Sequence, residues 1–108
     1  MLRNFKFALF CGLAVLLAGC VSPKKIVFVS GNSIHLWGDH EHVIMCEELC
    51  DMVNEASNGK VRAVHLDTQK TSDFSVLDDA DAIVISTEGE KSHPFAGKTD
   101  ILKKLNAK

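Results

Sequence analysis

Histidines and carboxylates crowd two short segments of this sequence, and side chains of these types can transfer protons or bind a ligand. Four of the five histidines fall within residues 30–42 and 87–95, which also hold four acids. Imidazole exchanges protons near neutral pH and coordinates metals through a neutral nitrogen. A plainer alternative is that residues 39–42 only begin a helix, whose dipole favours the acids there. The candidate pocket-lining residues are His35, His40, Glu41, His42, Glu88 and His93.

The spacing of these residues predicts neither a metal centre nor a cofactor. His40 and His42 are two residues apart and point in different directions on a helix, whereas the zinc helix pattern needs a spacing of four. Cys46 and Cys50 are four apart, which favours packing in the core over a metal site and is poor for a disulfide within a helix. No glycine-rich phosphate loop follows the first apolar run, so no nucleotide cofactor is predicted.

The first twenty residues have the pattern of a bacterial export signal. Arg3 and Lys6 precede an apolar run at 7–17, which is too short to span a bilayer comfortably. Leu17-Ala18-Gly19-Cys20 then resembles the lipobox, in which the cysteine is acylated and becomes the new amino terminus. We therefore predict a signal peptide at 1–19, a lipidated Cys20 and a membrane anchor, with an ordinary secreted protein as the alternative. The absence of Asp after Cys20 favours the outer membrane of a Gram-negative envelope.

The composition allows one small domain behind this signal. The chain has 108 residues, 46% hydrophobic residues and a formal net charge of −2. The charge gives no basic surplus for neutralising phosphates, so we predict no nucleic-acid partner. We divide the chain into the signal peptide, a lipidated tether at 20–23 and a domain at 24–108.

The elements alternate in the order typical of a parallel sheet. Strands are predicted at 26–29, 61–66 and 80–86, and helices at 39–57 and 98–106. Asp39 is the expected N-cap of the first helix, Asn58-Gly59 its stop, and a single helical turn the expected structure within 68–79. We predict an α/β sheet of order 2-1-3 with helices on both faces. The two histidine-bearing loops then meet at the carboxyl edge of the sheet, where such folds bind ligands.

The same residues resemble the opening of the ThuA-like (trehalose-utilisation) family. The resemblance rests on the run at 24–31, His35, the Gly-Asp-His-Glu-His stretch at 38–42, the Asp-Ala-Asp-Ala-Ile-Val-Ile run at 79–85, and Glu88-Gly89 with His93-Pro94. It covers about 24–105 and implies a class I glutamine amidotransferase-like, flavodoxin-like architecture linked to carbohydrate utilisation. The family domain is longer, so the resemblance implies the amino-terminal part of a truncated domain.

No nucleophile follows from the sequence or from the resemblance. Cys46 and Cys50 lie on the first predicted helix and do not match the amidotransferase elbow. Ser30 and Ser86 end predicted strands but lie in no G-x-S-x-G elbow. The catalytic residues therefore stay unassigned.

Two functions of different classes are open at this point. The first is part of a lipid-anchored domain that binds or transforms a carbohydrate at the carboxyl edge of the sheet. The second is a small non-catalytic envelope lipoprotein that acts as an interaction module, with the edge of the third strand as the interface of a homo-dimer or a complex. A metal-binding periplasmic module ranks last because the ligand spacing is weak.

Overall fold

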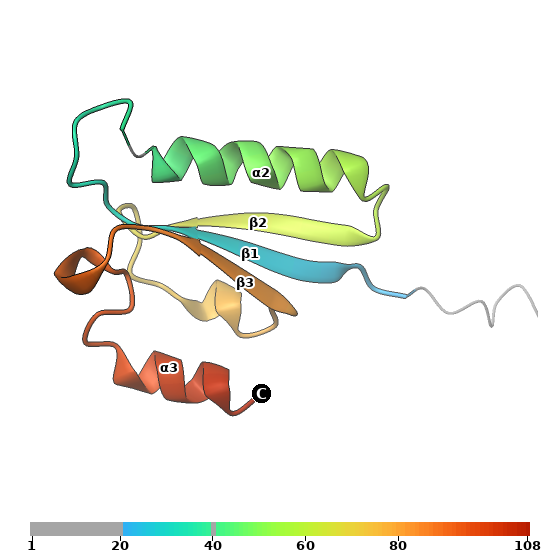
Figure 1. Ribbon diagram of the computed structural model, residues 1–108. Helices are drawn as coiled ribbons and strands as arrows, with labels where there is room; N and C mark the ends of the chain where they lie inside the picture. The colour runs from blue at the N-terminus through green and yellow to red at the C-terminus, as the bar shows by residue number, and fades with distance from the viewer. Residues whose placement is uncertain (1–20, 40) are drawn as a thin grey trace, which may run out of the picture.

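The computed structural model describes residues 21–39 and 41–108, which form a parallel sheet with helices on both faces (Figure 1). In chain order the elements are β1 (Lys24–Ser30), α2 (His42–Ala56), β2 (Val61–Asp67), the 3-10 turn η1 (Ser75–Leu77), β3 (Ala82–Ser86), the 3-10 turn η2 (Glu90–Ser92) and α3 (Thr99–Asn106). The strand order β2-β1-β3 confirms the predicted topology and the α/β class. The predicted signal peptide, the predicted lipid site Cys20 and the candidate residue His40 lie outside the described residues.

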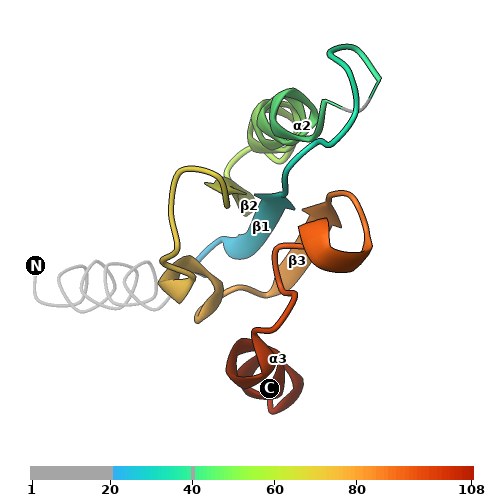
Figure 2. The same ribbon diagram turned by 90° about the vertical axis from the view of Figure 1, so that its left-hand side faces the viewer.

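β1 is the central strand and is buried on both faces, as its continuous apolar run predicts. Val27 and Val29 are fully buried on the face that also packs Leu77 and Phe95. Phe28 points to the opposite face and packs against the two cysteines of α2. Figure 2 shows α2 on one side of the sheet and α3 on the other. The core therefore has two layers, divided by the alternating side chains of β1.

The cysteines of α2 belong to this core, as their spacing predicts. Cys46 is 0% exposed and Cys50 is 6% exposed. Burial raises the pKa of the Cys46 thiol, and it raises the pKa of Cys50 to about 11. Both are free thiols in the structure, and a thiol held neutral by burial packs as a small apolar group.

α2 begins three residues later than predicted, and Asp39 is not its N-cap. The N-cap position is Glu41, whose carboxylate accepts a hydrogen bond from the Gly38 N–H (2.6 Å) and caps no helical N–H. Gly38 has a φ of +93°, and the Asp39 N–H donates to the Leu36 carbonyl (3.1 Å) in a separate turn. This turn at 36–39 is separate from the helix, which begins at His42. The predicted stop is correct: Asn58 and Gly59 both have positive φ.

β3 is shorter and more exposed than the predicted buried strand at 80–86. It starts at Ala82, and Val84 and Ile85 are each 42% exposed. α2 packs on β1 and β2, so Val84, whose register partner Phe28 faces α2, has no helix above it. The outer edge of β2 is partly covered, because the Asn54 side chain bonds both backbone groups of Ala63. No side chain in the described residues bonds the backbone of β3 in this way.

No described helix, within residues 21–39 and 41–108, combines the length and apolarity needed to cross a bilayer.

Candidate functional site at the carboxyl edge of the sheet

All three strands end at the same edge of the sheet, where polar side chains follow the apolar ones. Ser30 is the register partner of Ser86 on β3 and lies two residues after Phe28, on the face covered by α2. His65 on β2 reaches the same row, because its Nε2 lies 2.7 Å from the Ser30 Oγ. The first turn of α2 closes over this row. Hydroxyl and imidazole groups at the strand ends therefore lie in one row beside the start of α2.

The centre of the site is a trio formed by Ser86, His42 and Glu88. The His42 Nδ1 lies 2.8 Å from the Ser86 Oγ, and its Nε2 lies 3.3 Å from the Glu88 Oε1. The side chains of His42 and Glu88 are only 10% and 13% exposed. His35 reaches the same carboxylate, with its Nε2 3.5 Å from the Glu88 Oε2. Three of the predicted residues, His35, His42 and Glu88, are therefore brought together around one carboxylate.

This trio has the arrangement of a hydroxyl, a base and a group that orients the base. When the neutral His42 ring carries its proton on Nε2, that N–H donates to Glu88 and leaves Nδ1 to accept from the Ser86 hydroxyl. The same polarity activates serine or a substrate hydroxyl in Ser–His–carboxylate sites on unrelated folds. The geometry is thus suited to general acid–base chemistry on a hydroxyl group.

A cavity of about 420 Å³ opens beside this trio. Its lining is partly acidic and partly apolar, with Ile44 and Met45 exposed on the first turns of α2. Trp37, the single tryptophan of the chain, lies in the loop that leads to the cavity and is 88% exposed. The cavity is lined by Asp39, Glu41, His42, Ile44, Met45 and Ser86. It combines hydrogen-bonding groups with apolar contacts, as small-molecule sites do.

The remaining predicted residues lie at the margin of this site or outside it. Glu41 lines the cavity while bonding Gly38. His93 does not join the Glu88 cluster in the described part of the chain: its Nδ1 accepts a hydrogen bond from the Phe95 N–H (3.2 Å), and its ring packs against that of Phe95. His40 is not described.

A second hydroxyl–imidazole–carboxylate trio was missed by the sequence analysis. Ser30 is fully buried and bonds His65, whose Nδ1 lies 3.8 Å from the Glu47 Oε1 on α2. The signal that points to it is a polar residue near the carboxyl end of an otherwise apolar strand. None of these three side chains lines the cavity, and the trio instead joins β1, β2 and α2.

A close backbone contact holds the loop that carries Glu88. The Gly31 N–H donates to the Ser86 carbonyl (3.0 Å), and a Cβ on Gly31 would lie only 1.9 Å from the Thr87 Oγ1. Glycine is therefore required where the chain leaves β1. The Thr87 hydroxyl is buried and has no hydrogen-bond partner among the described residues.

The described residues contain no group of three or more His, Cys, Asp and Glu side chains placed to hold a metal ion. Comparison with known proteins gives no family: no family model, no curated protein and no solved structure matches this chain.

Proposed function

We propose that this chain is part of a lipid-anchored, ThuA-like envelope domain that binds or transforms a carbohydrate at the carboxyl edge of its sheet. The observation that carries the proposal is the Ser86–His42–Glu88 trio beside a cavity lined by Asp39 and Glu41. Carboxylates and imidazoles are suited to the hydroxyl groups of a sugar, and exposed apolar side chains to its C–H faces. The substrate class in this proposal comes from the family resemblance. The proton transfer is supported by the geometry of the Ser86–His42–Glu88 trio.

In this proposal His42 is the proton acceptor and donor. Glu88 orients its ring, and Ser86 or a substrate hydroxyl loses the proton to Nδ1. His35 is 47% exposed beside Glu88, where it can bond an incoming ligand. Cys20 carries the lipid, and the outer membrane is the proposed location.

Trp37 provides the test, because it is a single fluorophore in the loop beside the cavity. Trehalose or glucose is titrated into the full chain in mild detergent while tryptophan emission is recorded. We expect a saturable change in the wild type. We expect affinity to fall about two- to tenfold in His42→Ala, which removes the Nδ1 that would bond a sugar hydroxyl, since a hydrogen bond of this kind contributes about 0.5–1.5 kcal/mol.

A matched pair of carboxylate variants separates this site from a general charge effect. Glu88→Gln should weaken the sugar-dependent change, whereas Glu55→Gln, on the exposed face near the end of α2, should leave it unchanged. The proposal fails if neither sugar alters the emission. It also fails if Glu88→Gln binds the sugar as tightly as Glu55→Gln and the wild type do.

A second function is favoured by one specific observation, the uncovered edge of β3. Its five residues, Ala82–Ser86, carry no charge, and natural edge strands are usually protected by lysine, proline or a bulge. A protein-interaction module, including a homo-dimer, would use this edge. Light scattering of the full chain should then give a dimer mass that Val84→Lys reduces to a monomer mass and that Ile34→Lys, in an exposed loop, leaves unchanged. A monomeric wild type would refute the homo-dimer.

A further inference from the structure

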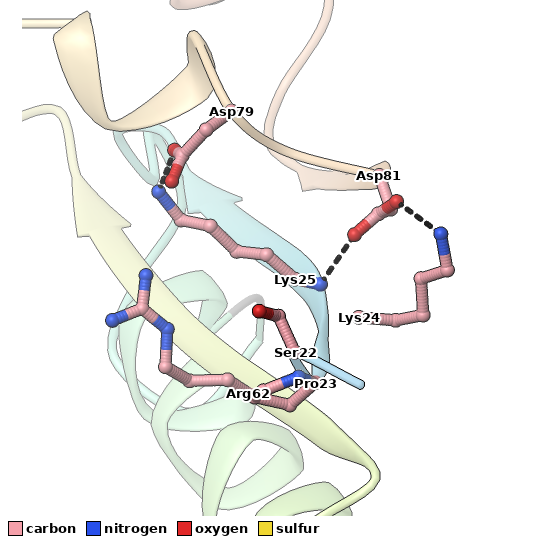
Figure 3. A pocket seen from close by; sticks show the side chains of 7 residues that line it. All are labelled: Ser22, Pro23, Lys24, Lys25, Arg62, Asp79 and Asp81. Atoms are coloured by element: carbon pink, nitrogen blue, oxygen red, sulfur yellow. Dashed lines mark hydrogen bonds and ion pairs between the residues drawn. The ribbon is translucent and has the colours of Figure 1, made fainter. Parts of the chain in front are cut away.

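The opposite edge of the sheet, where the strands begin, holds a larger cavity of about 450 Å³. It is lined by Ser22, Pro23, Lys24, Lys25, Arg62, Asp79 and Asp81 (Figure 3). Its cationic side chains come from adjacent strands, since Lys25 of β1 and Arg62 of β2 are register partners. Two cations thus lie side by side at the start of the sheet, far along the strands from the Ser86–His42–Glu88 trio.

Both carboxylates in this cavity are already engaged with the start of β1. Asp81 accepts hydrogen bonds from the Lys25 backbone N–H (2.7 Å) and from the Lys24 ammonium (2.9 Å). Asp79 pairs with the Lys25 ammonium, which also donates to the Val76 carbonyl (2.7 Å). These contacts appear as dashed lines in Figure 3 where both partners are drawn.

Arg62 is the cation of this cavity that neither acid bonds, although its charge, after that of Lys25, helps to lower the pKa of Asp79. Within residues 21–39 and 41–108 it has no hydrogen bond or ion pair, and it is exposed. Lys60, also exposed, lies at the same edge, because the Lys24 N–H donates to the Lys60 carbonyl (3.0 Å). The edge therefore has an excess of positive charge, and a guanidinium is the group best shaped to bind a phosphate through two hydrogen bonds.

The chain enters β1 at this same edge. Residues 21–23 are exposed and lead directly into Lys24. The proposed lipid site, Cys20, lies four residues before Lys24, and four extended residues span at most about 14 Å. An acylated Cys20 would therefore hold the amino edge of the sheet within reach of lipid headgroups, and this step rests on the anchor in the proposed function.

We propose that the cavity lined by Lys24, Lys25 and Arg62 binds the headgroup phosphate of an anionic phospholipid. Binding docks the amino edge of the sheet on the membrane surface. Because all strands are parallel, the Ser86–His42–Glu88 trio then faces away from the bilayer. A basic side chain near an anionic membrane surface contributes about a fivefold preference.

The rate at which an amine reagent modifies lysines tests this docking. The full lipidated chain is placed in phosphatidylcholine vesicles with or without 30% phosphatidylglycerol, and labelling of each lysine is followed by mass spectrometry. Lys24 has a side chain 73% exposed in the structure, and Lys91 is an exposed lysine of η2 at the opposite edge. We expect phosphatidylglycerol to slow labelling of Lys24 about fivefold and to leave Lys91 unchanged.

Two variants assign the effect to the cavity. Arg62→Gln should reduce the slowing of Lys24 to less than about twofold, and Lys103→Gln, a loss of one exposed charge on α3, should preserve it. Equal labelling of Lys24 in both vesicles, or slowing that survives Arg62→Gln, overturns the proposal. Equal slowing by inorganic phosphate in pure phosphatidylcholine would also overturn it, since the ligand would then be free phosphate.

The intact mass of the same sample separates this proposal from its premise. A chain without lipid on Cys20 overturns both the anchor and the docking. A lipidated chain whose Lys24 is equally reactive in both vesicles overturns the docking alone and leaves the anchor in place.

Discussion

Replacing Gly31 with alanine should destabilise the fold and displace the loop that carries Glu88. The added Cβ would lie 1.9 Å from the Thr87 Oγ1, 2.6 Å from the Thr87 Cβ and 3.2 Å from the Pro94 Cδ. Carbon atoms pack at about 3.5–4.0 Å, so the Thr87 Cβ must retreat by about 1 Å. A rotamer change can move the hydroxyl, but the Cβ moves only with the backbone. The backbone is held by the Gly31-to-Ser86 hydrogen bond (3.0 Å).

The expected cost is about 1–3 kcal/mol from overpacking, with up to about 1 kcal/mol more if the backbone hydrogen bond is lost. The assay is urea unfolding of the full chain followed by circular dichroism, in which the midpoint should fall with the slope unchanged. Gly89→Ala is the matched control from the same loop. Its position has extended backbone (φ −82°, ψ −171°) and nothing within 4 Å of a new Cβ. Its stability should change by less than about 0.5 kcal/mol.

A double-mutant cycle identifies the clash itself. Thr87→Gly removes both atoms that a Cβ on Gly31 would overlap, so Gly31→Ala should cost markedly less in that background. The reasoning is refuted if Gly31→Ala is as stable as Gly89→Ala, or if its cost is the same with and without the Thr87 side chain.

Burial and charge lead to three further predictions. Thr87→Val should stabilise the protein by about 1 kcal/mol in urea unfolding, because the Thr87 hydroxyl is buried without a partner in the described residues; a loss of stability would contradict this. The pKa of Asp81 is lowered by its hydrogen bonds from the Lys25 N–H and the Lys24 ammonium. The stability that ionised Asp81 contributes is therefore complete above the ordinary pKa of 3.8, and it is lost as the pH falls through the lower pKa of the folded state. Asp81→Asn should therefore flatten the loss of stability below about pH 4 in urea midpoints measured against pH, and an unchanged profile would refute the assignment. Cys50, whose pKa is raised to about 11 chiefly by burial, should react with a thiol reagent at neutral pH only as the chain unfolds, so fast labelling without urea would contradict its place in the core.

The hydrophobic pattern was sufficient to predict the sheet because β1 is buried on both faces, with Val27 and Val29 on one face and Phe28 on the other. The start of α2 was not predictable in the same way. It depends on a left-handed Gly38 and on where the Glu41 carboxylate bonds, which are details of one turn rather than of periodicity. The exposure of β3 was mispredicted because an apolar sequence predicts a buried strand whether or not a helix covers that strand.

The candidate site was predicted only to the level of which loops meet. Parallel topology brings His35, His42 and Glu88 to one edge, and this follows from strand order alone. The participation of Ser86 and His65 depends on strand register and on side-chain direction. These were fixed by pairing across the sheet, which no local motif encodes.

The central place of β1 has a consequence for how the chain is made. β1 is synthesised before either of its neighbours, and Val27 pairs with Val64 on one side and Ile83 on the other. The most buried strand of the domain therefore does not have both partners until the chain has passed Ser86. Pairing between such distant segments is slow to form. Until then this strand is the part of the chain that most needs protection from wrong contacts.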